Sequence, residues 1–285
     1  MKKTGTITIL LILAVAVVLS AALMKDDGKA AYYTALDEAL AAAKPDQLVV
    51  AKFETDWCIW CKVMDTGVFA KPQAIDFFKN DMVLAKIDAE KDTVVAQKYS
   101  VSGYPTSVLM DKNGNEIDRI LGYYPADEYI QMLKDYSHGI GTLEDLLSKA
   151  EENKDRSLFL EIAEKYKYSG RPAKAENWYG RVIEAGEPHD SLSGTCRIAI
   201  ADMYRRAKEY DRSLAAFNQI AEEFKTGMFA EQAEIYRGIV LSAKGDTAEA
   251  IAAFEEFTVD FPESEDVEYA NDQIDKLKKI NKQGI

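Results

Sequence analysis

Two cysteines separated by two residues, Cys58 and Cys61, have the clearest capacity for covalent chemistry in this sequence. They follow an apolar run, residues 48–53, that predicts a buried strand, and they precede a pattern that predicts a helix. A helix N-terminus carries partial positive charge and free N–H groups, so it stabilises a sulfur anion. The thiol pKa is near ~8.5 in a free cysteine and falls to roughly 3.5–7.5 in such CxxC settings. Because the thiolate is the nucleophile of disulfide exchange, the motif predicts a redox-active dithiol.

Exchange chemistry gives the two cysteines different roles. Cys58, at the helix start, attacks a partner disulfide, and Cys61, one turn further in, resolves the mixed disulfide. Two other interpretations stay open. A zinc site needs four ligands, but Cys196 and the two histidines, His138 and His189, lie far away in sequence, so we expect no metal and no cofactor. A purely structural disulfide closing so short a loop would add little stability.

The first residues have the pattern of a targeting segment. Lys2 and Lys3 precede an uncharged apolar run over residues 7–24, which places the N-terminus in the cytoplasm and the rest of the chain outside it. Small residues at 20–22 suit a signal peptidase, and the run is also long enough to span a bilayer. We predict that residues 1–27 are a cleaved signal peptide or an inner-membrane anchor, and that the protein is periplasmic or otherwise extracytoplasmic.

The composition limits the classes of function. A chain of 285 residues, 47% of them hydrophobic, can form two ordinary domains with buried cores. The formal net charge of −13 argues against nucleic-acid binding, which needs a basic face. The chain has three cysteines, and two of them form the CxxC pair. This usage predicts a working dithiol rather than a framework of structural disulfides.

Residues 28–140 have the pattern of an α/β domain. Apolar runs bounded by turn signals predict strands at 48–54, 82–87, 107–110 and 116–121. Helical periodicity predicts helices at 30–43, 58–69, 73–79, 93–99 and 126–137. We therefore expect parallel strands with crossover helices first and an antiparallel hairpin afterwards.

This region resembles the thioredoxin fold. It carries the W-C-x-x-C-K motif at residues 57–62 and a Gly-Tyr-Pro-Thr segment at 103–106. In that family the proline before the third strand is cis and faces the dithiol, which implies this role for Pro105. The resemblance also implies that the backbone of Tyr104 pairs with an extended substrate and that Trp57 shields the site.

The Asp-Trp-Cys opening at residues 56–58 and the Phe-x-x-Pro segment at 69–72 resemble the thioredoxin-like domains of exported, membrane-associated disulfide reductases. This resemblance favours a reductase or isomerase-type donor over an oxidase. One position departs from the family pattern. Many thioredoxins carry a buried aspartate six residues before the first cysteine, and Lys52 stands there in this chain. Glu54 lies two residues on, on the same strand face, and we predict it as a substitute base. The alternative is a solvated glutamate at the strand end.

Residues 141–285 contain three similar helical copies. Their small, turn and aromatic residues align in columns: Ala163, Ala201 and Gly238; Gly170, Lys208 and Gly245; Ala175, Ser213 and Ala250; Tyr179, Phe217 and Phe254. The pattern resembles the tetratricopeptide repeat, in which small residues allow paired helices to approach closely. Residues 264–281 predict a terminal capping helix. Cys196 falls on the first helix of the second copy and is interpreted as a buried apolar residue, with a regulatory or intermolecular thiol as the alternative.

The leading hypothesis is an exported thiol–disulfide oxidoreductase with protein disulfides as substrates and a protein as electron donor. The repeats would dock a partner peptide or helix in their groove. The competing hypotheses are a non-catalytic scaffold, an assembly factor, or a chaperone that uses the repeat groove.

Overall fold

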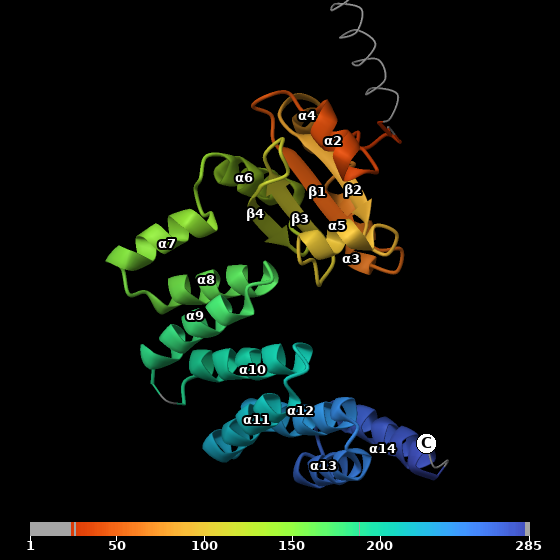
Figure 1. Cartoon of the computed structure of the whole chain (residues 1–285), viewed down its shortest axis with the longest axis vertical. Coiled ribbons are helices and arrows are strands. Elements are labelled where there is room, and N and C mark those ends of the chain that lie inside the picture. Colours follow the sequence, from red (N-terminus) through yellow and green to blue (C-terminus); the bar gives the residue numbers. More distant parts are fainter. Residues whose placement is uncertain (1–23, 26, 188, 283–285) are drawn as a thin grey trace, which may run out of the picture. The chain divides into compact units, whose positions relative to one another are not determined.

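The computed structural model describes residues 24–25, 27–187 and 189–282, and these form two compact units. The first unit contains the described residues up to Glu152 together with Tyr168–Gly170, and the second contains Asn153–Lys167 and the residues from Arg171 onward. The expected domain boundary between residues 140 and 141 stays a prediction. An α/β unit is followed by an all-α unit, which confirms the expected fold class (Figure 1).

The first unit is built on a four-stranded sheet in the order β2-β1-β3-β4 (Figure 1). Its strands are β1 (Val49–Glu54), β2 (Val83–Asp88), β3 (Thr106–Met110) and β4 (Glu116–Leu121). β1 pairs with β2 in parallel and with β3 antiparallel, and β3 and β4 form the predicted antiparallel hairpin. The strand predictions are therefore confirmed to within a residue or two.

Helices cover both faces of this sheet. They are α2 (Leu36–Ala42), α3 (Ile59–Gly67), α4 (Pro72–Asn80), α5 (Thr93–Lys98) and α6 (Ala126–Ser137). Because side chains alternate along a strand, Val50 joins a core with α3, α4 and α6, whereas Val49 and Ala51 join a second core with α2 and α5. Lys52 has the same parity as Val50, so it points to the face that α3 covers.

The predicted helix over residues 30–43 is shorter in the structure, where α2 begins at Leu36. Before it, Tyr32 and Tyr33 form isolated β-bridges, and the partner of Tyr33 is Ala85 on the edge strand β2. The Tyr33 N–H donates to the carbonyl of Leu84, and the Tyr33 carbonyl accepts from the N–H of Lys86. Backbone pairing across the sheet edge thus replaces the first helical turn that periodicity predicts.

The second unit is a stack of helix pairs. They are α8 (Arg156–Tyr168) with α9 (Pro172–Glu184), α10 (Ser191–Arg206) with α11 (Tyr210–Phe224), and α12 (Met228–Lys244) with α13 (Thr247–Asp260), followed by α14 (Val267–Lys282). A further helix, α7 (Leu143–Glu152), belongs to the first unit. The turn column adopts positive φ in all three copies, at Gly170, Lys208 and Gly245. The aligned repeats therefore share one turn geometry.

The predicted N-terminal segment lies almost wholly in residues 1–23, outside the described residues. In the ranges that the structure describes, none of the helices combines the length and the apolar character needed to cross a membrane.

Candidate active site

The dithiol lies where β1 passes into α3. Cys58 is the N-cap of α3, and the backbone N–H of Cys61 points at its sulfur, with 3.1 Å between nitrogen and Sγ. The Cys58 N–H donates to the carbonyl of Thr55 at 3.2 Å, which fixes the entry into the helix. Cys58 and Cys61 are joined as a disulfide, and both residues are buried. A sulfur anion at position 58 would meet the free N–H groups of the helix N-terminus.

Exposed aromatic and apolar side chains surround the buried disulfide. Trp57, Ile59 and Trp60 are 64%, 73% and 59% exposed, which is unusual for residues of this size. Trp57 stands edge-on to Tyr104 with 5.8 Å between ring centroids, and Trp60 stacks on Tyr123 at 5.9 Å. The motif therefore presents an apolar surface of a kind that marks an interaction site.

The Tyr104–Pro105 bond is cis, as the resemblance implies. Pro105 directly precedes β3, and its carbonyl accepts from the N–H of Gly122 at 2.8 Å. The contact between the rings of Trp57 and Tyr104 brings this segment to the dithiol motif. Sequence positions more than forty residues apart thus meet at the end of the sheet where β1 leads into α3. The roles of Trp57, Tyr104 and Pro105 towards a substrate stay predictions.

Four charged side chains from β1, β2 and α3 form what we call the charge cluster: Lys52, Glu54, Asp65 and Lys86. The two lysines are buried, whereas Glu54 and Asp65 are 26% and 25% exposed. Lys52 is 0% exposed, and its ammonium contacts Glu54 and donates to Asp65 at 3.1 Å. Lys86, the register partner of Lys52 on β2, donates to the same Asp65 oxygen at 2.8 Å. Lys52 also donates to the carbonyl oxygen of Cys61 at 3.3 Å. The cluster is thus hydrogen-bonded to the helix that carries the dithiol.

The pKa values in this cluster reflect a balance between burial and ion pairing. Burial alone would raise the pKa of the Asp65 carboxyl, but the charge of Lys52 and the hydrogen bond from Lys86 hold it below its usual range. Burial lowers the pKa of the Lys86 ammonium, and the hydrogen bond and charge of Asp65 offset only part of that effect. Asp65 is therefore held as a carboxylate between two lysines.

The structure brings Glu54 to Lys52 rather than to a cysteine. Its carboxylate contacts the Lys52 ammonium, and among the described residues no hydrogen bond joins Glu54 to Cys61. The prediction of Glu54 as a base therefore remains untested. Sequence reasoning missed Asp65, although its position four residues after Cys61 puts both on one helix face. It also missed Lys86, whose place depends on the strand register.

The remaining candidate side chains lie elsewhere. Cys196 is fully buried in α10, where burial raises the pKa of its thiol to about 12. This agrees with the interpretation of Cys196 as an apolar core residue. Within the described ranges, no three or more histidine, cysteine, aspartate or glutamate side chains gather as a metal site would require.

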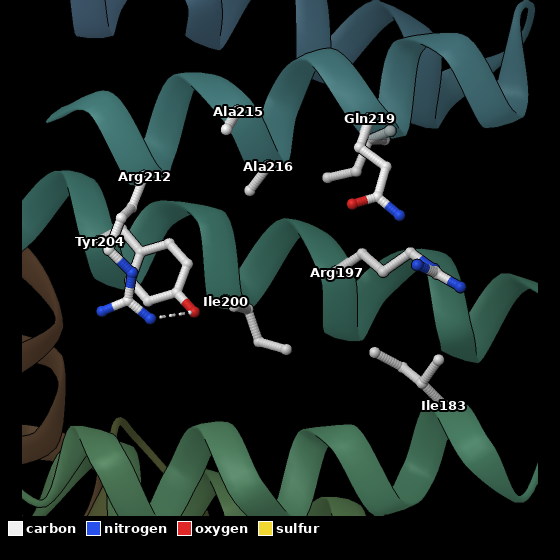
Figure 2. A pocket seen from close by; sticks show the side chains of 9 residues that line it. Ile183, Arg197, Ile200, Tyr204, Arg212, Ala215, Ala216 and Gln219 are labelled. Atoms are coloured by element: carbon white, nitrogen blue, oxygen red, sulfur yellow. Dashed lines mark hydrogen bonds between the residues drawn. The ribbon is translucent and has the colours of Figure 1, made fainter. Parts of the chain in front are cut away.

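The second unit contains a groove of about 370 Å³ between α9, α10 and α11. Figure 2 shows Tyr204 and Arg212 at one end of this groove and Arg197 and Gln219 at the other. The Arg212 guanidinium donates to the Tyr204 hydroxyl at 2.9 Å. Apolar side chains complete the lining: Ile183, Ile200, Ala215, Ala216 and Ile220. Both guanidinium groups also pair with carboxylates of this unit, Arg197 with Glu223 and Arg212 with Glu176 and Glu209.

Comparison with known families agrees with both units. Residues 32–137 match the thioredoxin-like domain family, and residues 232–264 match the tetratricopeptide repeat family. Residues 32–137 are a thioredoxin-like domain. The three aligned copies extend the repeat pattern over more of the second unit than the family match covers.

Several curated relatives share the thioredoxin-like domain. The thiol:disulfide interchange protein DsbD of Haemophilus influenzae strain PittEE is 30% identical over 105 residues, which are 35% of this chain and 18% of that protein. DsbD of Pseudomonas fluorescens is 32% identical over 103 residues, 34% of this chain and 17% of the relative. The chain thus spans less than a fifth of the length of these relatives.

Solved structures with detectable likeness include a DsbH oxidoreductase and the oxidised C-terminal domain of Neisseria meningitidis DsbD. The first is 21% identical with a TM-score of 0.35 and covers 38% of this chain and 83% of the other. The second is 28% identical with a TM-score of 0.30, and the match covers 35% of this chain and 88% of that domain.

Proposed function

We propose that this protein is a thiol–disulfide oxidoreductase that acts on protein disulfides through Cys58 and Cys61. The observation that carries the proposal is the disulfide-forming pair at the N-terminus of α3, where the Cys61 N–H points at the Cys58 sulfur. The names of the DsbD relatives, which describe thiol:disulfide interchange, support the same chemistry.

In the reduced protein, the Cys58 thiolate attacks one sulfur of a client disulfide, and the other client sulfur leaves as a thiolate. Cys61 then loses its proton and attacks the Cys58 sulfur, so the Cys58–Cys61 bond forms as the bond to the client breaks. The client is reduced by two electrons, and a protein thiol donor returns them to the dithiol. Glu54, held by Lys52, is the proposed acceptor of the Cys61 proton.

We favour the reductase direction because the flanking residues resemble exported disulfide reductases. We favour an extracytoplasmic location because disulfides form and persist outside the cytoplasm. The apolar run at 7–24 would carry the chain there as a signal peptide or an anchor. The Trp57, Ile59 and Trp60 surface would contact the client chain on either side of its cysteine.

Insulin reduction with dithiothreitol as electron source tests the activity. We expect catalysis by the wild-type protein and none by the Cys58→Ser variant. A Cys61→Ala variant should trap the client as a mixed disulfide on Cys58. Equal insulin reduction rates for wild type and Cys58→Ser would instead support the scaffold or chaperone alternative.

The groove of the second unit is the proposed docking site for a partner peptide or helix. Such docking would raise the local concentration of the partner disulfide near the dithiol to about 1 mM for a short tether. Ala215→Glu would place a carboxylate on the groove wall, whereas Asn218→Glu adds the same charge at an exposed position outside this lining. We expect Ala215→Glu alone to slow reduction of the docked partner, with insulin reduction unchanged in both variants. Equal rates of partner reduction by the Ala215→Glu and Asn218→Glu variants would refute docking in this groove.

A further inference from the structure

Lys52 is a fully buried lysine beneath the helix that carries the dithiol, and the exchange steps above give it no chemical role of its own. A buried ammonium is rare unless anions pair with it. Glu54 and Asp65 supply two carboxylates, which accounts for a charged side chain at this position. The remaining question is what a cation does at the place where many thioredoxins bury a carboxylate.

The contact with Cys61 answers part of this question. The Lys52 Nζ lies 3.3 Å from the carbonyl oxygen of Cys61, and the sulfur is separated from that oxygen by the backbone and Cβ atoms of the same residue. A nearby positive charge favours the anionic form of a thiol, and a negative charge disfavours it. Lys52 therefore brings a positive charge to the position where many thioredoxins carry a negative one.

We propose that the ammonium of Lys52 stabilises the anionic form of the reduced Cys58–Cys61 pair, acting from the Cys61 side while the N-terminus of α3 acts on Cys58. The proposal deepens the proposed function, and it makes Lys52 a positioning residue because it acts through the dithiol. When two thiols reduce the disulfide, the S–S bond breaks and a donor disulfide forms. One protein sulfur keeps a proton, the other proton passes to solvent, and the remaining sulfur anion is the species that Lys52 stabilises.

Other groups face Lys52 and limit the size of its effect. Glu54 on β1 and Asp65 on α3 carry negative charge, and Lys86 on β2 adds positive charge. The Phe69 ring lies 5.5 Å from the Lys52 ammonium, and Tyr32 lies against Lys86. The four charges of the cluster sum to zero. We therefore expect Lys52 to change the thiol ionisation constant by about tenfold, which is the smallest effect typical of a close opposite charge.

The test uses the full-length protein and needs no client. Wild type, Lys52→Met, Lys52→Arg and Lys86→Met are equilibrated with reduced and oxidised glutathione, and the reduced proteins are alkylated over a range of pH. Lys86→Met is the matched control, because it removes the same charge from the same cluster but no hydrogen bond to Cys61. Cys196 is buried with its thiol pKa raised to about 12, so it should contribute little alkylation.

We expect Lys52→Met to shift the glutathione equilibrium about tenfold towards the protein disulfide and to slow alkylation of Cys58 at neutral pH. Lys52→Arg keeps the positive charge, so it should retain the wild-type glutathione equilibrium and alkylation rate. Lys86→Met should shift the equilibrium less than Lys52→Met does. An unchanged equilibrium in folded Lys52→Met, or an equal shift in Lys86→Met, would overturn the proposal. Should Lys52→Met fail to fold, Lys52→Gln, which keeps an N–H donor without the charge, carries the same expectation. A shifted equilibrium together with inactivity towards insulin would refute the proposed function and leave this inference standing.

Discussion

Asp65→Asn should destabilise the thioredoxin-like unit strongly, because one Asp65 oxygen accepts from two buried lysines. It lies 3.1 Å from the Lys52 ammonium and 2.8 Å from that of Lys86. Removing one partner of a buried ion pair costs about 3–5 kcal/mol. Asparagine keeps an acceptor oxygen and Glu54 still pairs with Lys52, so we expect a loss of about 3 kcal/mol, the low end of that range.

Urea unfolding measures this loss. In a Trp178→Phe background the remaining tryptophans, Trp57 and Trp60, both report on the thioredoxin-like unit. With a denaturant slope of about 2 kcal/mol per molar, the midpoint should fall by about 1.5 M. The control is Asp76→Asn on α4, an exposed aspartate for which we expect a change within about 0.5 kcal/mol.

The pH dependence follows from the depressed pKa of Asp65 in the folded state. A carboxyl with a lowered folded pKa contributes stability that is present above its unfolded pKa, about 3.9, and is lost as pH falls through the folded value. The stability difference between wild type and Asp65→Asn should therefore be constant near neutral pH and narrow below about pH 4. A difference under about 1 kcal/mol at neutral pH would refute the view of the cluster as tightly coupled.

Four further substitutions test individual positions by urea unfolding. Lys208→Gly should stabilise the repeats by up to about 1 kcal/mol, since Lys208 has a φ of 62° where glycine is favoured; a loss of stability would contradict this. Gly238→Ala should destabilise by about 1 kcal/mol, because its Cβ would lie 2.6 Å from the buried Phe254 ring, whereas Gly180→Ala, with open space around it, should stabilise slightly. Thr55→Val should be neutral or stabilising by about 1 kcal/mol, because the buried Thr55 hydroxyl has no hydrogen-bond partner among the described residues. A marked loss of stability in Thr55→Val would instead indicate that this hydroxyl has a hydrogen-bond partner.

The sequence predicted those features that depend on local pattern. Strand and helix periodicity gave the order of elements in the first unit, and the resemblance of the segment around Pro105 to the thioredoxin family implied the cis bond. Repeat alignment placed Lys208 in a glycine column, and the structure gives it the same positive φ. These features follow from residues close together in the chain or from an internal comparison.

The features that were missed depend on pairing between distant segments. Tyr33 bridges to β2 and so delays the start of α2, which helical periodicity alone does not reveal. Lys86 meets Asp65 because it is the register partner of Lys52. Glu54 was predicted as a base from its strand face alone. The same face holds Lys52, whose ammonium pairs with the Glu54 carboxylate. A local pattern identifies the charged residues, but the sheet register decides which of them pair.

Stability and thiol chemistry can be separated in this cluster because its charges have opposite signs. Asp65→Asn leaves the buried Lys86 without its carboxylate, and Lys52→Met leaves Glu54 without its lysine, so both should destabilise the fold. Their effects on the dithiol should nevertheless be opposite. Removing the Asp65 carboxylate leaves the field of the two lysines less compensated and favours the sulfur anion, whereas removing the Lys52 ammonium disfavours it. If the cluster acted on the dithiol only by holding α3 in place, the two substitutions would shift the glutathione equilibrium in the same direction.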